Sequence, residues 1–381
     1  MSKWEMVRLG DVASFNMGQS PSSESYNSIG EGLPFFQGKT DFGLMHPTVR
    51  MYCTEPKKTA EKYDILISVR APVGTVNIAT EICCIGRGLA SITQKEKISD
   101  YKYLFYYLYC IENDIARMGV GSTFKAISKK DLDTIKIPLP PLSVQQKIAD
   151  ILDRANVLIE KRKSQIEKLD LLVKSRFVEM FGDFAINDMG WDVKPFGEFA
   201  IIDATMTTEY DKYADFPHIG IDSIESGTGE LKGYRTVKQD GVKSGKYIFT
   251  PDHIIYSKIR PNLNKVALPT FEGLCSADAY PIRNNETNCD KVFLAYVLRS
   301  ELFLAYILPL SFRTNFPKAN REQIAGFSMP LPPLPLQNRF AYFVRAVDKS
   351  KFILQQALDK QYLLYKSLMQ KCFNGDIDIT G

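Results

Sequence analysis

The amino-acid sequence repeats itself, and this internal repeat limits the possible folds more than any other feature. Residues 137–142 read Ile-Pro-Leu-Pro-Pro-Leu and return as Met-Pro-Leu-Pro-Pro-Leu at 329–334, a shift of 192. The segment that begins Trp4-Glu5 is echoed by the one that begins Trp191-Asp192, a shift of 187. Small differences in the shift indicate loop insertions. The sequence therefore predicts one unit of about 190 residues that is used twice.

Two shorter matches lie between these ends, both at a shift of 190. Ser68-Val69-Arg70 matches Lys258-Ile259-Arg260, and residues 105–108 match residues 295–298. We therefore expect Arg70 and Arg260 to occupy equivalent positions. The pair could share a binding role, or each arginine could form a structural ion pair.

Each half shows the same order of predicted elements. Runs rich in β-branched residues and bounded by Gly or Pro, at 65–69 and 254–257, predict strands. Helical spacing of apolar residues predicts short helices at 101–112 and 291–304. The Pro-rich segment then ends the mixed region, because proline fits neither a helix interior nor a central strand. One long helix follows it in each half.

The long helices carry an apolar repeat with alternating steps of four and three residues, which is typical of coiled-coil packing. Ser143 and Gln146 predict a capping box at the first helix, and Gly182 and Gly375 predict the two helix ends. Two amphipathic helices on separate cores are the alternative to one shared seam. The residues predicted to form the seam are Ile148, Leu152, Ile159, Ile166, Leu169, Val173, Val344, Val347, Leu354, Leu358, Tyr365 and Leu368.

The order of the predicted elements suggests a particular architecture. Each helix would be about 57 Å long, because an α-helix rises ~1.5 Å per residue. If the helices pair antiparallel, a pseudo-twofold axis relates the halves and places the globular domains at opposite ends. One turn of B-DNA is ~34–36 Å, so each domain could meet a major groove. The predicted fold class is α+β: two tandem mixed α/β domains separated by two long antiparallel coiled-coil helices, with domain and helix boundaries at 1–142, 143–182, 183–334 and 335–381.

Charge and cysteine content narrow the class of function. Lys and Arg number 48 and Asp and Glu 44, and a net charge of +4 is too small to indicate a nucleic-acid partner alone. The long helices carry +7 and the remainder −3, which favours either phosphate contact along the helices or a solvated helix face. Seven cysteines without a disulfide-like spacing favour a cytoplasmic location. The longest apolar run is far shorter than the ~18–20 residues of a membrane span.

Motifs for catalysis and metal binding are missing from the sequence. The Pro-Pro pairs lie only in Leu-Pro-Pro-Leu, without the polar residue that a base-methylating loop needs. Gly38-Lys39-Thr40 lacks the upstream glycine of a P-loop, and His46, His218 and His253 are too isolated for a zinc site. The sequence therefore predicts a binding protein. A scaffold for protein partners and an enzyme with an unrecognised site are the alternatives.

Several short sequence motifs follow one another in the same order in both halves. Residues 121–128 (Gly-Ser-Thr-Phe-Lys-Ala-Ile-Ser) lead to the first Pro-rich segment and then to Gln145-Gln146. Arg313-Thr314-Asn315-Phe316 leads to the second Pro-rich segment and to Gln337-Asn338. With the word Ile-Arg-Pro-Asn-Leu at 259–263, these features closely resemble the specificity subunits of type I restriction–modification enzymes. The resemblance covers essentially the whole chain.

The resemblance implies two target-recognition domains, each reading one half of a bipartite, asymmetric site in double-stranded DNA. The helices would set the spacer and dock the methyltransferase (modification) subunits, of which two are expected, and restriction/translocase subunits would complete the enzyme. S-adenosylmethionine, ATP and Mg²⁺ would be used by those partner subunits. This chain would bind none of them and would have no catalytic residues, no metal and no membrane partner.

Polar loops of the two domains hold side chains suited to base edges and phosphates. Phe124 and Phe316 are expected to anchor cores rather than to stack on bases, and Tyr26, Tyr210 and Tyr213 could do either. The DNA-binding candidates are Gln37, Lys39, Thr40, Arg70, Arg87, Ser122, Thr123 and Lys125 in the first domain, and Lys258, Arg260, Asn262, Lys265, Arg313, Thr314, Asn315 and Lys318 in the second.

Overall fold

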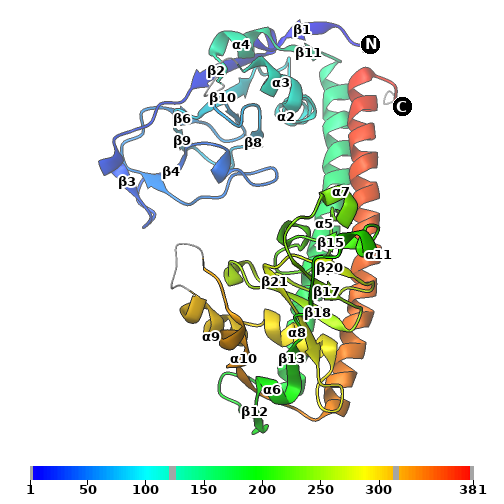
Figure 1. The fold of residues 1–381 in the computed structure, drawn as a ribbon. Helices are drawn as coiled ribbons and strands as arrows, with labels where there is room; N and C mark the ends of the chain where they lie inside the picture. Colours follow the sequence, from blue (N-terminus) through cyan, green and yellow to red (C-terminus); the bar gives the residue numbers. More distant parts are fainter. Residues whose placement is uncertain (1–2, 120–125, 312–316, 378–381) are drawn as a thin grey trace. The chain divides into compact units, whose positions relative to one another are not determined.

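The computed structural model describes residues 3–119, 126–311 and 317–377. It divides into two compact units. Figure 1 shows the chain coloured from the N-terminus to the C-terminus. The first unit consists of residues 1–164 and 355–381, and the second of residues 165–354. Each long helix therefore contributes one segment to each unit.

The described part of the first unit contains a two-stranded, a four-stranded and a five-stranded sheet. The four-stranded sheet is antiparallel, in the order β2-β10-β7-β8. The five-stranded sheet has the order β3-β5-β4-β9-β6 and pairs β4 with β9 in parallel, and β1 pairs with β11. The strands are β1 (Met6–Arg8), β2 (Ala13–Met17), β3 (Tyr26–Asn27), β4 (Leu33–Phe36), β5 (Tyr52–Cys53), β6 (Thr59–Ala60), β7 (Ile65–Ser68), β8 (Val76–Ile78), β9 (Cys83–Ile85), β10 (Leu89–Gln94) and β11 (Lys136–Pro138).

The core of this unit lies partly between its two larger sheets. Strand β7 reads Ile-Leu-Ile-Ser and all four of its residues are buried, as expected for a strand covered on both faces. Leu66 of β7 and Leu89 of β10 pack in one cluster with Phe36 and Ile85 of the five-stranded sheet. The strand predicted at 65–69 is confirmed, apart from its last residue.

The second unit contains sheets of the same sizes. Its antiparallel sheet has the order β13-β21-β18-β19, its five-stranded sheet the order β14-β17-β20-β15-β16 with β15 and β20 parallel, and β12 pairs with β22. Strand β18 confirms the strand predicted at 254–257. The strands are β12 (Val193–Pro195), β13 (Ala200–Ile202), β14 (Met206–Thr207), β15 (Pro217–Ile219), β16 (Arg235–Thr236), β17 (Lys246–Phe249), β18 (His253–Ser257), β19 (Val266–Ala267), β20 (Gly273–Cys275), β21 (Ala279–Asn284) and β22 (Ser328–Pro330).

Each short helix predicted from the sequence is in fact a pair of helices. The first pair breaks at Ile111 and the second at Ser300, whose backbone is extended and whose hydroxyl donates to the Val297 carbonyl (2.7 Å). Asp100 and Asp290 cap the first helix of each pair through their side chains. The helices are α2 (Tyr101–Cys110), α3 (Glu112–Met118), α8 (Lys291–Arg299) and α9 (Glu301–Ser311), with α1 (Leu9–Val12), α4 (Lys129–Thr134), α6 (Phe196–Phe199), α7 (Val237–Asp240) and α10 (Arg321–Ala325) elsewhere.

The two long helices are α5 (Leu142–Phe181) and α11 (Leu334–Asn374). Gly182 and Gly375 follow them directly, both with φ of 75°, so the predicted ends are confirmed. The capping box predicted at Ser143 is wrong, because α5 begins one residue earlier. The carbonyl of Pro141 accepts from the N–H groups of Val144 (2.8 Å) and Gln145 (3.0 Å), which fixes that start.

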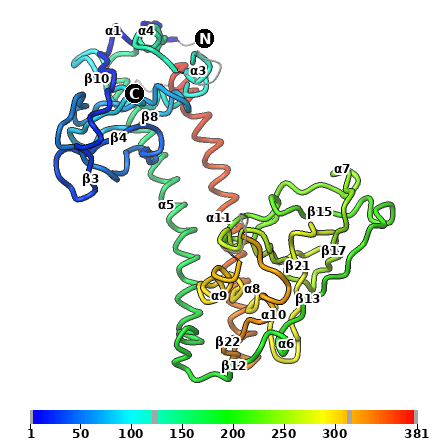
Figure 2. The backbone as a smooth tube through the Cα atoms, turned by 60° about the vertical axis from the view of Figure 1, so that its left-hand side comes forward, coloured from blue at the N-terminus to red at the C-terminus, as the bar shows by residue number. Residues whose placement is uncertain are grey.

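Segments of α5 and α11 pack against each other within each unit (Figures 1 and 2). In the first unit the Lys163 ammonium lies 5.5 Å from the ring centroid of Tyr362. In the second unit Asp170 pairs with Lys351, and the rings of Phe177 and Phe340 meet edge to face. Residue numbers fall along α11 as they rise along α5, so the packed segments run antiparallel in each unit. The twelve residues predicted to form the seam are buried or half-buried.

The ends of the described chain meet in the first unit. The N–H of Lys3 donates to the carbonyl of Asn374 (2.8 Å). Among the described residues, no single helix has the length and apolar character of a membrane span. The bent pair α8 and α9 reaches that length and apolar character only when the two helices are counted together.

Candidate nucleic-acid interface

Three of the candidate residues of the first unit lie in adjacent loops. The Gly86 N–H donates to the Phe36 carbonyl (2.8 Å), which places Gln37 beside the loop that holds Arg87. The Val69 N–H donates to the Gly88 carbonyl (2.9 Å), which brings Arg70 to the same loop. Gln37, Arg70 and Arg87 are all exposed. This edge of the first unit therefore gathers one amide and two guanidinium groups.

Lys39 and Thr40 lie just beyond Gln37 on a 3₁₀ turn (Lys39–Asp41). Both side chains are exposed, and the Lys39 ammonium lies 3.9 Å from the Glu112 carboxylate. An exposed ion pair of this length contributes little to stability, so Lys39 can exchange Glu112 for another anion.

Six candidates fall outside the described residues. They belong to segments 120–125 and 312–316, and so do Phe124 and Phe316. Just beyond these segments, Ala126 bridges to Arg70 and Lys318 bridges to Ile259. The six are Ser122, Thr123, Lys125, Arg313, Thr314 and Asn315.

The candidates Lys258 and Lys318 of the second unit lie close to one carboxylate. The Lys318 ammonium is 3.4 Å from Asp278, and Lys258 lies with its ammonium 4.4 Å from the ring centroid of Tyr280. Lys258 is only 8% exposed. Burial and the neighbouring charge of Lys318 lower the pKa of Lys258, and Asp278 offsets them only in part.

Lys246, which the sequence did not single out, belongs to the same neighbourhood. It is also 8% exposed, and its ammonium donates to the carbonyl and the hydroxyl of Ser244 (2.8 and 2.7 Å). Burial lowers the pKa of Lys246, and the Asp278 carboxylate opposes that shift.

The other described candidates of the second unit differ in whether the side chain is exposed or bonded to the main chain. Arg260 and Asn262 are exposed, whereas the half-buried Lys265 donates from its ammonium to the Ile221 carbonyl (2.8 Å). Arg260 has φ of 46°, a left-handed conformation that few non-glycine residues adopt. Its N–H donates to the Pro317 carbonyl (2.8 Å), which holds it there. Lys265 therefore has a structural role, whereas Arg260 is exposed and has an unusual backbone conformation.

Equivalent main-chain hydrogen bonds inside each unit show which residue of the second unit corresponds to which residue of the first. The Val69 N–H donates to Gly88 and the Val69 carbonyl accepts from Ile127 (2.9 and 3.0 Å). Lys258 forms the same two bonds, its N–H donating to Asp278 (3.0 Å) and its carbonyl accepting from Ala319 (2.8 Å). Val69 therefore corresponds to Lys258.

This register corrects the expected pairing of the two arginines. Arg70 corresponds to Ile259, since both form the isolated bridge that follows the strand. The expectation that Arg70 and Arg260 are equivalent is wrong by one residue. The sequence match aligned two identical side chains, whereas the hydrogen bonds align the backbone.

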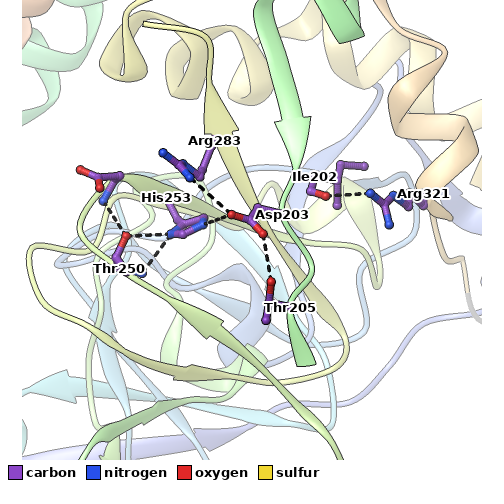
Figure 3. Close-up of polar contacts among 8 residues, drawn as sticks. Ile202, Asp203, Thr205, Thr250, His253, Arg283 and Arg321 are labelled. Carbon is purple, nitrogen blue, oxygen red and sulfur yellow. Dashed lines mark hydrogen bonds and ion pairs between the residues drawn. The ribbon is translucent and has the colours of Figure 1, made fainter. Parts of the chain in front are cut away.

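A closed polar cluster occupies the opposite end of strands β18 and β21 from Lys258 (Figure 3). The Thr250 N–H donates to Nδ1 of His253 (2.9 Å), so that nitrogen carries a lone pair and Nε2–H faces Asp203 (3.3 Å). Partial burial raises the pKa of Asp203, but hydrogen bonds from His253 and Thr205 and the charge of Arg283 outweigh it and leave that pKa below its usual value. Because its charges are matched internally, this cluster stabilises the fold and is not a candidate for binding DNA.

Gln145 and Gln337 have a role that the sequence did not reveal. Each is fully buried at the start of its long helix. The Gln145 amide accepts from the Asp100 N–H (2.9 Å) and donates to the carbonyls of Ile98 (3.0 Å) and Pro140 (2.9 Å). Gln337 forms the same three bonds in the second unit. The order Pro-Pro-Leu-x-x-Gln, present in both halves, was the available signal.

The described residues hold no group of three or more His, Cys, Asp or Glu side chains arranged to bind a metal ion. Two small pockets, of about 250 and 330 Å³, lie at the starts of α8 and α2. Neither is lined by a candidate residue. No arrangement among the described residues suggests a bound cofactor.

Comparison with known proteins identifies the family. A family model described as "Type I restriction modification DNA specificity domain" matches residues 1–168 and again residues 189–361. The chain belongs to this family. The putative type I restriction enzyme MjaX specificity subunit of Methanocaldococcus jannaschii is 54% identical over 171 residues, which are 43% of this chain and 40% of that protein. The type I restriction enzyme EcoDI specificity subunit of Escherichia coli is 30% identical over 315 residues, 72% of this chain and 70% of that protein.

A solved structure supports the fold of this type I specificity chain. The S subunit of a type I restriction–modification system from M. genitalium matches 98% of the chain and 96% of its own length, with a TM-score of 0.61 and 16% identity. The fold therefore extends over nearly the whole chain. The match to the M. jannaschii relative, which is the more similar in sequence of the two specificity subunits, spans less than half of that protein's length.

Proposed function

We propose that this chain is the noncatalytic, sequence-specific DNA-binding subunit of a type I restriction–modification system. Each domain would read one half of a bipartite, asymmetric site in double-stranded DNA. The long helices would set the spacer between the halves and dock the modification subunits. The observation that carries this proposal is that equivalent loops of the two units present different side chains on four-stranded sheets of the same strand order.

Three equivalent positions illustrate the difference between the loops. Val69 of the first unit corresponds to Lys258 of the second, at the end of equivalent strands. By the same register Gly88 corresponds to Asp278, and Ala126 corresponds to Lys318. Base edges differ in their donors and acceptors, so two domains that read unlike half-sites need unlike side chains on a common frame.

The exposed apolar side chains of the helices support the docking part of the proposal. Leu171 and Leu172 of α5 are 60% and 47% exposed, and Leu363 and Leu364 of α11 are 70% and 69% exposed. The two pairs are separated by 192 residues, the shift that relates the helices. Paired leucines left in solvent favour a protein partner, and their repetition favours two copies of that partner.

The DNA-reading part can be tested with the chain and its modification subunits together. Methylated adenines are mapped genome-wide with and without the chain, and one split sequence motif should depend on it. Binding of the complex to that motif should exceed binding to scrambled DNA of equal length. The affinity should also fall with salt, with a log–log slope of about −0.9 per phosphate contact.

Three results would contradict this part of the proposal. Equal affinity for the motif and for scrambled DNA would remove sequence recognition. Binding to protein partners without any salt-dependent DNA binding would favour a scaffold. Methylation or nicking by the chain alone would favour an enzyme.

The docking part is tested by changing the exposed leucines. Leu171→Glu with Leu172→Glu, and Leu363→Glu with Leu364→Glu, should each remove one modification subunit in a mass measurement of the complex. Ile29→Glu is the matched control, because Ile29 is 77% exposed but lies outside the helices. Full assembly by both leucine variants would contradict docking at these pairs.

The partner subunits would supply the remaining chemistry. S-adenosylmethionine would be bound by the modification subunits, and ATP and Mg²⁺ by the restriction/translocase subunits.

A further inference from the structure

The second unit has lysines, Lys258 and Lys318, at two positions where the first unit has none, and a third lysine, Lys246, lies near them. Lys246, Lys258 and Lys318 all act electrostatically on or beside one carboxylate, Asp278. Asp278 leads into strand β21, whose Tyr280 ring lies under the Lys258 ammonium. We call Lys246, Lys258, Lys318 and Asp278 the lysine cluster.

The lysine cluster has more positive charge than its own carboxylate can neutralise. Its three ammonium groups carry about +3 if all are protonated, and Asp278 removes one unit, which leaves about +2. Two of the lysines are only 8% exposed, so they hold this charge where water screens it poorly. Buried charge without full compensation is costly, so a cluster of this kind favours an anionic ligand.

The first unit shows that the fold does not require these charges. Its residues at the positions of Lys258, Asp278 and Lys318 are Val69, Gly88 and Ala126. The same strands and the same main-chain bonds form there without any of the three charges. Lys258, Asp278 and Lys318 are therefore additions to the second domain, and a binding role accounts for them better than a folding role.

We propose that the lysine cluster binds a backbone phosphate of the duplex at the half-site read by the second domain. This inference rests on the proposed DNA-binding function. An ammonium is a point charge without the paired donors that recognise a guanine edge or a carboxylate, so it suits a phosphate oxygen. Asp278 holds Lys318 in place by the ion pair and limits the attraction for free anions.

The matched experiment gives the second domain the residues of the first. The double variant Lys258→Val with Lys318→Ala is compared with wild-type full chain on the duplex selected by the wild type. The salt slope should become shallower by about 0.9, the share of one phosphate contact, and affinity should fall roughly eight-fold near 0.1 M salt. The preference for the correct over a scrambled second half-site should stay within about two-fold, because phosphate contacts carry no base information.

A second variant acts in the opposite direction. Asp278→Asn removes the opposing charge and should strengthen DNA binding several-fold, with a slope at least as steep as that of the wild type. Thermal unfolding of each variant shows that the fold persists, and the reciprocal Val69→Lys change in the first unit is the position control.

The outcomes separate this inference from the function it rests on. Wild-type chain with no salt-dependent preference for any duplex would overturn the proposed function itself. A wild type that binds DNA with an unchanged slope in the double variant would overturn the cluster alone. A changed half-site preference with an unchanged slope would assign the lysines to bases. Competition by inorganic phosphate at matched ionic strength, seen for wild type and lost in the double variant, would assign the cluster to a free anion.

Discussion

At the scale of single residues, side-chain chemistry revealed the general class of the candidate site but not its details. Exposed Gln37, Arg70 and Arg87 could be chosen because polar side chains in loops suit base edges. Lys246 begins strand β17 and no local pattern marked it, whereas Gln145 was marked only by the repeated order Pro-Pro-Leu-x-x-Gln. Two partners of Gln145, Ile98 and Asp100, are distant in sequence, and only the folded backbone brings them together.

The buried glutamines give a prediction at this scale. Gln337→Ala should destabilise the chain by about 2–4 kcal/mol, because one N–H and two carbonyls lose their buried partner. Chemical unfolding measures the effect. The neighbouring exposed Asn338→Ala should change stability by less than about 0.5 kcal/mol. Equal effects of the two changes would show that the amide bonds are unimportant.

Asp203 gives a second residue-scale prediction, on pH. Its pKa is lowered in the folded chain, so its stabilisation is present above the unfolded pKa, near ~3.9, and is lost as pH falls through the folded value. Asp203→Asn should cost about 1–2 kcal/mol at neutral pH, where it weakens charge-assisted hydrogen bonds. The stability difference between variant and wild type, measured by unfolding from pH 7 to about pH 3, should begin to narrow below about pH 4.

The control for this pH experiment is Asp211→Asn, since Asp211 is an exposed carboxyl on a 3₁₀ turn of the same unit. It should leave the pH profile close to that of the wild type. A stability difference for Asp203→Asn that stays constant down to pH 3 would refute the argument.

At the scale of elements, the long helices and the buried strands were predictable because their patterns are long or strongly apolar. The ends of α5 and α11 followed from single glycines. The breaks at Ile111 and Ser300 were missed because apolar spacing continues through them. Two-residue strands such as β5 and β6 carry no periodicity at all, so the five-stranded sheets could not be predicted.

A helix end provides the prediction at this scale. A Cβ at Gly182 would lie 2.0 Å from the Asp188 carboxylate, which already accepts from the Asp183 N–H (2.9 Å). Gly182→Ala should therefore cost more than the ~1–2 kcal/mol of a left-handed alanine, by about 1 kcal/mol. Gly190→Ala is the matched control, with φ of 67° and no atom within 4 Å of the added Cβ. Identical losses in thermal unfolding would exclude the clash.

At the scale of the whole molecule, the repeated Pro-rich words and repeated helices were enough to indicate the family. One family model matches twice along the chain, and the four-stranded sheets of the two units share one strand order, as expected for a unit used twice. The bases in each half-site could not be predicted, because side chains at equivalent loops differ and one sequence offers no contacts to compare.

The proposed spacer role predicts a change in the DNA site. Inserting four residues, about one turn or ~6 Å, into each of α5 and α11 should lengthen the preferred spacer. Both half-sites should stay the same, as read by mapping methylated adenines. A four-residue insertion at the exposed Gly227 loop is the control and should leave the spacer unchanged. A spacer unaffected by the helix insertions would contradict the role of the helices.

The bonds of Gln145 and Gln337 have an evolutionary consequence. Every partner of these two amides is a main-chain N–H or carbonyl. Main-chain groups are the same whatever side chain a residue carries. Mutations can therefore change the surface side chains of either domain without weakening its hydrogen bonds to the long helix. A new DNA specificity can then arise while the domain and helix keep their packing.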